Sequence, residues 1–207
     1  MKKENKKQET NPEKDKKTYD KQLKVIVVCI AAAVVFLVFA FVVVSSVRHF
    51  DYRNVKYDVV KEGEIIFYNT ALPFYTITGK HVADYNVYLR KDPRELRDIK
   101  FEGEFVQKQD LVLNLTEEFN CDGDGVIAIA NFVQVFEALG TRVVKDPNAM
   151  CDSQGRYMFT QIKSSDETKI QQTGPACYDI YIADCEILDG TERFIQELLV
   201  KINDEKT

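Results

Sequence analysis

The chain has 207 residues, of which 45% are hydrophobic and 29% are charged, a length that allows one or two ordinary domains. Its formal net charge of −5 combines two unlike parts. Residues 1–24 contain nine Lys and five acidic side chains, whereas residues 48–207 contain 19 Lys and Arg against 28 Asp and Glu. An acidic main part without a basic stripe lacks the charge pattern on which phosphate-backbone binding depends, so we expect no nucleic-acid partner.

The first 24 residues contain few large apolar side chains. Such a segment cannot bury enough surface to offset the chain entropy lost on folding, so we predict a disordered cytoplasmic tail over residues 1–24. Its lysines would suit binding to anionic lipids, but the five interspersed acids weaken that attraction.

A run of 20 residues without any charge follows, from Val25 to Val44. At about 1.5 Å per residue, a helix of this length crosses a hydrocarbon core of about 30 Å. We therefore predict a transmembrane helix over residues 25–47, with the lipid bilayer as its partner. The run exceeds the apolar region of a secretory signal peptide, roughly 7 to 15 residues, and its charged head is also long. These lengths favour an uncleaved signal anchor over a cleaved signal peptide.

Basic residues on the two sides of the predicted span indicate its orientation. Seven lysines lie near its N-terminal end, whereas the C-terminal side has four basic residues, Arg48, Arg53, Lys56 and Lys61. Cytoplasmic segments carry the excess of Lys and Arg in membrane proteins. We therefore expect a single-pass protein of the cell membrane, with a cytoplasmic N-terminus and residues 48–207 outside.

Residues 48–207 are long enough to form one domain with a buried core. Runs rich in β-forming residues flank Glu62-Gly63 and predict a hairpin there, and the pattern repeats around Gly79-Lys80. Asp92-Pro93 then predicts a short helical turn that reaches about residue 98, with Asp as the N-cap.

The second half of this domain alternates strands and helices. Apolar residues at helical spacing predict a central, mostly buried helix over residues 126–139, which Gly140 ends. A last helix is predicted over residues 190–202, where Asp189 and Glu192 have the spacing of a capping box. Strands are predicted over residues 111–115, 141–144, 157–162 and 178–183. This order of elements indicates an α+β domain with a mainly antiparallel sheet and two principal helices.

A location outside the cell would place Cys121, Cys151, Cys177 and Cys185 in a disulfide-permissive environment, so we expect structural disulfides. One continuous strand would hold Cys177 and Cys185 about 26 Å apart, too far for a bond between them. We favour Cys121–Cys151, because both residues stand in the same local pattern, Cys-Asp-x-x-Gly. A zinc–thiolate site and thiol redox chemistry are the alternatives, although the chain has no CxxC or HxxxH pattern.

The segment NCDGDGVIAIANFVQVFEALG resembles the calcium loop and following helix of EF-hand and dockerin modules. The resemblance covers about 20 residues and places Gly125 at loop position 6, where the loop turns sharply, with the carbonyl of Val126 next to it. It implies a calcium site in which loop positions 1, 3, 5 and 12 are Asn120, Asp122, Asp124 and Asn131.

Only two carboxylates would contribute to this calcium site. The resemblance therefore implies weak binding, about 10⁻⁴ to 10⁻³ M, as in extracellular modules. The alternative is an Asp-Gly turn whose Asp side chains bond the local backbone and cap the following helix.

The sequence contains no GxSxG, Walker A or HExxH motif and no kinase set, so it supports no enzyme class, and a non-enzyme is favoured. An anchor followed by one compact domain is typical of a membrane-anchored extracytoplasmic binding or accessory module. Its expected partner is another membrane or envelope protein. The alternative is a membrane-tethered enzyme that uses metal or thiol chemistry near residues 120–152.

Overall fold

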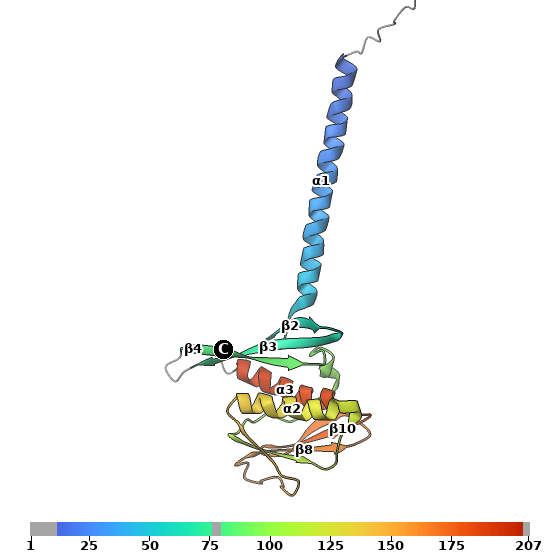
Figure 1. The fold of residues 1–207 in the computed structure, drawn as a ribbon. Helices are drawn as coiled ribbons and strands as arrows, with labels where there is room; N and C mark the ends of the chain where they lie inside the picture. Colours follow the sequence, from blue (N-terminus) through green and yellow to red (C-terminus); the bar gives the residue numbers. More distant parts are fainter. Residues whose placement is uncertain (1–11, 76–79, 205–207) are drawn as a thin grey trace, which may run out of the picture. The chain divides into compact units, whose positions relative to one another are not determined.

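The computed structural model describes residues 12–75 and 80–204, so the turn predicted around Gly79 lies partly outside the described residues. The chain divides into two compact units, Met1–Val47 and Arg48–Thr207. Figure 1 shows the elements of both units in chain order.

The first unit contains one long helix, α1 (Pro12–Arg48). Its part from Lys24 to Arg48 is long and apolar enough to cross a membrane, and nearly all of its side chains are exposed. The apolar side chains of a core helix in a soluble domain are instead buried. This part of α1 is therefore a candidate membrane anchor or signal sequence.

The helix begins inside the segment that was expected to be disordered. Residues 12–24 are helical, and the rest of the predicted tail lies outside the described residues. A charged segment that extends an existing helix avoids the cost of nucleating a new one. A prediction from the composition of residues 1–24 alone does not include this stabilisation by the neighbouring apolar helix.

The second unit has three layers, with helices α2 (Asp124–Ala138) and α3 (Ile187–Asp204) between two sheets (Figure 1). The first sheet is antiparallel and consists, in spatial order, of β1 (His49–Tyr52), β2 (Val55–Glu62), β3 (Ile65–Tyr75) and β4 (His81–Leu89). β1 begins at the residue directly after α1. The hairpin predicted at Glu62-Gly63 joins β2 to β3 and is confirmed.

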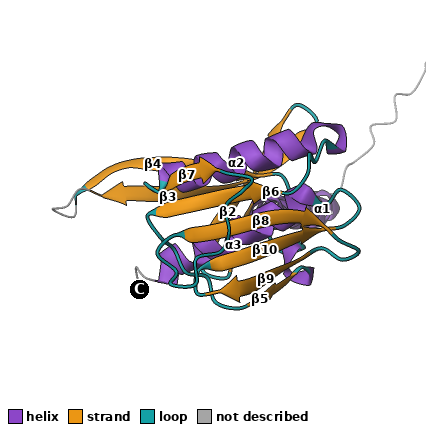
Figure 2. Ribbon diagram, turned by 90° about the horizontal axis from the view of Figure 1, so that it is seen from below, coloured by secondary structure: helices purple, strands orange, loops and turns teal. Residues whose placement is uncertain are grey.

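The second sheet has the order β5-β9-β10-β8-β6-β7 (Figure 2). Its strands are β5 (Lys100–Glu102), β6 (Asp110–Leu115), β7 (Arg142–Lys145), β8 (Met158–Ser164), β9 (Lys169–Gly174) and β10 (Cys177–Ile182). Among the described strands of this second sheet, only the pairing of β9 with β10 is antiparallel, and the other pairings are parallel.

The predicted α+β class and an antiparallel sheet are confirmed, but the second sheet is mainly parallel. α2 returns the chain from the end of β6 to the start of β7, and such a crossover makes the two strands parallel. The predicted strands of the second half coincide with β6, β7, β8 and β10. The polar sequence KIQQTG of β9 gave no strand signal.

The core between α3 and the second sheet is rich in aromatic side chains. Phe194 of α3 is fully buried, and its ring centroid lies 5.2 Å from that of Tyr178, 5.3 Å from that of Phe105 and 5.6 Å from that of Phe132. Aromatic pairs at these separations contribute attraction beyond the area that they bury. This cluster fixes α3 and α2 on one face of the second sheet.

The predicted capping box at the start of the last helix is wrong. α3 begins at Ile187, so Asp189 and Glu192 lie inside the helix. The Glu192 carboxylate instead accepts hydrogen bonds of 2.8 Å from the backbone N–H groups of Arg90 and Lys91. These partners lie about 100 residues away, and no local pattern reveals them.

α2 is less buried than its sequence indicated. Its buried residues are Gly125, Ala128, Phe132, Val135 and Phe136. Val126 and Ile127, at its start, are 70% and 41% exposed. The helix packs on α3 and β7 with one side only, which leaves apolar side chains of its first turns in solvent.

Candidate functional site

Two disulfides connect the four cysteines of the second unit, Cys121 with Cys185 and Cys151 with Cys177, with Cα–Cα distances of 5.5 and 5.7 Å. The favoured pairing of Cys121 with Cys151 is therefore wrong. Cys177 and Cys185 are unbonded to each other, and β10 is continuous over Cys177–Ile182. A similar local sequence around two cysteines does not bring them together in space. The order of the strands in the sheet decides which cysteines meet.

The Cys121–Cys185 bond joins two turns. Cys121 belongs to η2 (Cys121–Gly123), the turn between β6 and α2, and Cys185 lies between β10 and α3. Cys121, Asp122, Asp184 and Cys185 all have positive φ, from 42° to 62°. Residues other than glycine rarely adopt this conformation. The bond thus joins two tight turns, one after the carboxyl end of β6 and one after the carboxyl end of β10.

The residues of the predicted calcium site do not form a ring of ligands. α2 already begins at Asp124, which places Val126 and Asn131 within the helix rather than in a loop. The Asn131 amide donates a hydrogen bond of 3.2 Å to the carbonyl of Tyr88. Within residues 12–75 and 80–204, no group of three or more His, Cys, Asp or Glu side chains could hold a metal ion. Calcium binding by Asn120, Asp122, Asp124 and Asn131 stays a prediction without support from this geometry.

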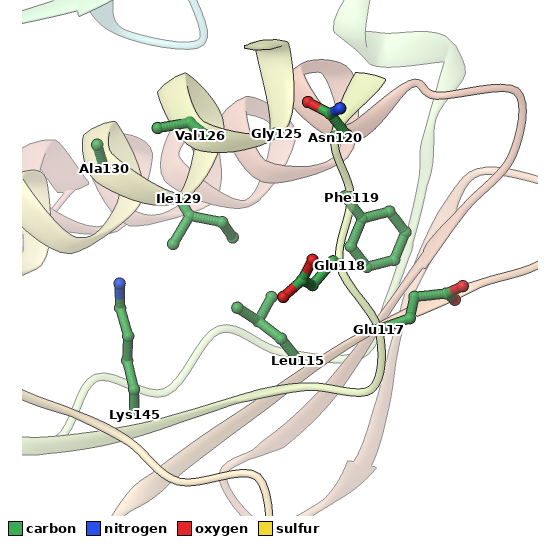
Figure 3. A pocket seen from close by; sticks show the side chains of 10 residues that line it. All are labelled: Leu115, Glu117, Glu118, Phe119, Asn120, Gly125, Val126, Ile129, Ala130 and Lys145. Atoms are coloured by element: carbon green, nitrogen blue, oxygen red, sulfur yellow. The ribbon is translucent and has the colours of Figure 1, made fainter. Parts of the chain in front are cut away.

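An open groove of about 620 Å³ lies beside the same segment, at the start of α2 (Figure 3). It is lined by Leu115, Glu117, Glu118, Phe119, Asn120, Gly125, Val126, Ile129, Ala130 and Lys145. Leu115, Phe119 and Ile129 are partly buried and pack against the core with the rest of their surface. They give the groove an apolar floor whose shape the core determines.

Gly125 is required for the shape of this groove. A Cβ atom at this position would lie 1.6 Å from the carbonyl oxygen of Phe119 and 2.7 Å from its carbonyl carbon. Only glycine lets the backbone at Phe119 approach the first turn of α2 so closely. The sequence motif read as the sharp turn of a calcium loop therefore has a packing role in the structure.

The groove lies at the carboxyl ends of two parallel strands. β6, α2 and β7 form a βαβ unit, in which Leu115 ends β6 and Lys145 ends β7. Ligands of open sheets that contain parallel strands commonly bind outside the carboxyl ends of those strands. The position of the groove in the fold thus agrees with that of many known binding sites.

Glu117 and Glu118 are neighbours in sequence but differ in their surroundings. Glu117 accepts a hydrogen bond of 3.0 Å from the backbone N–H of Ser164, which ties the β6–α2 loop to the end of β8. The side chains of Glu118 and Lys145 extend toward the space beside Leu115 and Ile129 (Figure 3). Neither of these two charged groups takes part in an ion pair within the described part of the chain. The groove therefore has two carboxylates, Glu117 and Glu118, and one cationic group, Lys145, next to an apolar floor.

A second set of charged residues lies between α3 and the first sheet. Glu197 pairs with Arg193 of the same helix and with Arg53 of the β1–β2 turn. Burial raises the pKa of Glu197, but hydrogen bonds from Arg53 and attraction to Arg193 outweigh it, so the pKa is lower than usual. These contacts hold layers of the fold together, and we assign them a structural role.

No known family model matches the chain, and neither a curated protein nor a solved structure is significantly similar to it. The case for a function therefore depends on the geometry of this chain alone.

Sequence reasoning did not identify the groove. Leu115, Phe119 and Ile129 have the pattern of ordinary core residues, and the acidic pair Glu117-Glu118 matches no binding motif. One sequence signal was available: a strand, a short loop with glycine and a helix mark the start of a βαβ unit. The sequence does not show which side of each of these apolar residues is left uncovered by the rest of the fold.

Proposed function

We propose that the chain is a membrane-anchored extracytoplasmic binding module, whose second unit holds a segment of another membrane or envelope protein in the groove at the start of α2. The observation that carries the proposal is the groove itself, an open apolar site at the carboxyl ends of β6 and β7. Sites of this size, with an apolar lining and a few polar groups, are typical of specific binding sites.

An exposed apolar side chain at the groove supports partner binding. Val126, which lines the groove, is 70% exposed, and its neighbour Ile127 in the first turn of α2 is 41% exposed. Exposed apolar residues are common where one protein binds another.

The anchor and the location are part of the same proposal. The apolar part of α1 has the length of a membrane span, and lysines are more frequent on its N-terminal side. The two disulfides support an oxidising compartment for the second unit.

Site-specific photo-crosslinking tests the proposal. The photoreactive amino acid p-benzoylphenylalanine is incorporated in place of Val126 in the full-length protein, and membranes of the native cells are irradiated. We expect one major adduct of defined mass, identified by mass spectrometry as a membrane or envelope protein. The matched control carries the same amino acid in place of Glu64, an exposed residue in the β2–β3 turn. Absence of an adduct at position 126, or the same adduct from position 64, would contradict the proposal.

A further inference from the structure

The edge strand β7 lies next to the groove and has unpaired backbone groups. β7 is the last strand in the order of the second sheet. The backbone N–H groups of Arg142 and Asp146 donate to the carbonyls of Gln109 and Leu113, on the side of β6. Because successive residues of a strand point their backbone groups to opposite sides, the N–H and C=O groups of Val143 and Lys145 face away from β6.

Charged side chains commonly protect such an edge against a further strand. The two charged residues of β7 are directed elsewhere. The Arg142 guanidinium donates a hydrogen bond of 2.8 Å to Asp110 on β6, and the Lys145 side chain extends into the groove (Figure 3). The charged side chains of β7 therefore do not protect its free edge against pairing with a further strand.

We infer that the groove and the free edge of β7 form one site, which binds an extended partner segment as a seventh strand of the second sheet. Backbone groups of this segment pair with Val143 and Lys145. Alternate side chains of an added strand point to the same face, so one of them enters the groove above Leu115 and Ile129. This inference rests on the proposed function and specifies how the partner is held.

The charges of the groove specify the chemistry of the segment. Its apolar side chain lies on the floor, a basic side chain on one flank faces Glu118, and an acidic side chain on the other flank faces Lys145. Glu118 and Lys145 lack an ion-pair partner within the described residues, so a segment with complementary charges gains two new pairs. A segment with like charges at these places would be repelled.

Fluorescence anisotropy on the full-length protein in lipid nanodiscs tests the inference. The labelled probes are two peptides with the central patterns Lys-Thr-Leu-Thr-Glu and Glu-Thr-Leu-Thr-Lys, and the same two peptides with Ser in place of Leu. We expect one of the two Leu peptides to bind and its Ser version to bind at least about tenfold more weakly. Glu118→Gln should weaken the binding by about two- to fivefold, as for exposed ion pairs, and Glu64→Gln should leave it unchanged.

Backbone methylation distinguishes strand pairing from other modes of binding. The bound Leu peptide is synthesised with N-methyl groups on every second residue, in the two alternative registers. One register removes the N–H groups that pair with β7 and should lower the affinity by about tenfold or more, whereas the other should have little effect. Equal affinities for both methylated peptides, or no binding of either Leu peptide, would overturn the inference. A crosslink from position 126 together with these negative results would leave the proposed function intact, whereas peptide binding without any crosslink would count against the proposed function alone.

Discussion

Glu192 places a carboxyl group in the interior of the second unit, where its exposed fraction is only 1%. Burial raises its pKa to about 8, although hydrogen bonds from the backbone of Arg90 and Lys91 act in the opposite direction. In the unfolded chain a Glu has a pKa of about 4.3, so the folded state binds this proton more tightly. The stabilisation from this group is complete below about pH 4.3 and is lost as the pH rises through about 8.

Glu192→Gln should remove this pH dependence. The amide has no proton to lose in this range, so we expect the Tm of the variant to fall less than that of the natural protein between pH 5 and pH 9. At pH 5 the variant should be less stable by about 1 to 3 kcal/mol, because its amide nitrogen cannot accept the second backbone hydrogen bond, whereas the hydroxyl oxygen of the protonated carboxyl can. Thermal unfolding of the full-length protein in detergent, followed by circular dichroism, measures both effects. Glu186→Gln, at an exposed position just before α3, is the control, and identical pH slopes for the two variants would refute the assignment.

Gly125→Ala tests the close contact that shapes the groove. The added Cβ would overlap the Phe119 carbonyl, so the loop must move away from α2. We expect a loss of about 1 to 3 kcal/mol in the free energy of unfolding, as for other overpacked sites. Denaturant unfolding measures the change, and Val126→Ala, at the exposed neighbouring position, should stay within about 0.5 kcal/mol of the natural protein. Equal stability of the two variants would show that the loop accommodates a side chain at position 125 freely.

At the scale of elements, the sequence predicted most helices and strands, because their hydrophobic periodicity survives in the fold. The incorrect predictions concern features that depend on contacts between residues distant in the sequence. β9 is held by its neighbours β5 and β10 rather than by its own apolar pattern. α3 starts earlier than expected, and Glu192 inside it accepts hydrogen bonds from a distant loop instead of capping the helix end. The disulfide pairing depends on which strand ends are adjacent, and this is a property of the sheet order.

The disulfides give a prediction at this scale. In the chain-entropy model, removal of Cys121–Cys185, which spans 64 residues, costs about 4 kcal/mol, and removal of Cys151–Cys177, which spans 26 residues, costs about 3.5 kcal/mol. We therefore expect the double variant Cys121→Ser/Cys185→Ser to be the less stable of the two double Ser variants, as judged by denaturant unfolding. Peptide mapping without reduction should recover the two bonded pairs, and a linked peptide that joins Cys121 to Cys151 would contradict the structure.

At the scale of the whole molecule, an apolar segment is easier to recognise in the sequence than the candidate site. A 20-residue uncharged run is visible in one dimension. The groove instead depends on which face of Leu115, Phe119 and Ile129 is left uncovered by elements distant in sequence. Of the four residues singled out as metal ligands, only Asn120 lines the groove.

The proposed orientation of the chain leads to a whole-molecule prediction. In intact cells that express the full-length protein with a tag at each end, added protease should remove the C-terminal tag and spare the N-terminal tag, because in the proposed orientation only the second unit lies outside. Immunoblots against the two tags measure the result, and permeabilised cells should lose both tags. Protection of the C-terminal tag in intact cells would reverse or remove the proposed topology.

α1 ends at Arg48 and β1 begins at His49, so α1 and the second unit follow one another directly along the chain. With α1 in a bilayer, the groove would search for the proposed membrane partner by lateral diffusion in two dimensions. Two proteins in the same membrane have a higher effective concentration than two proteins in solution. A modest affinity of the groove for the partner segment is therefore enough to keep the groove occupied. A freely diffusing partner would gain nothing from this arrangement.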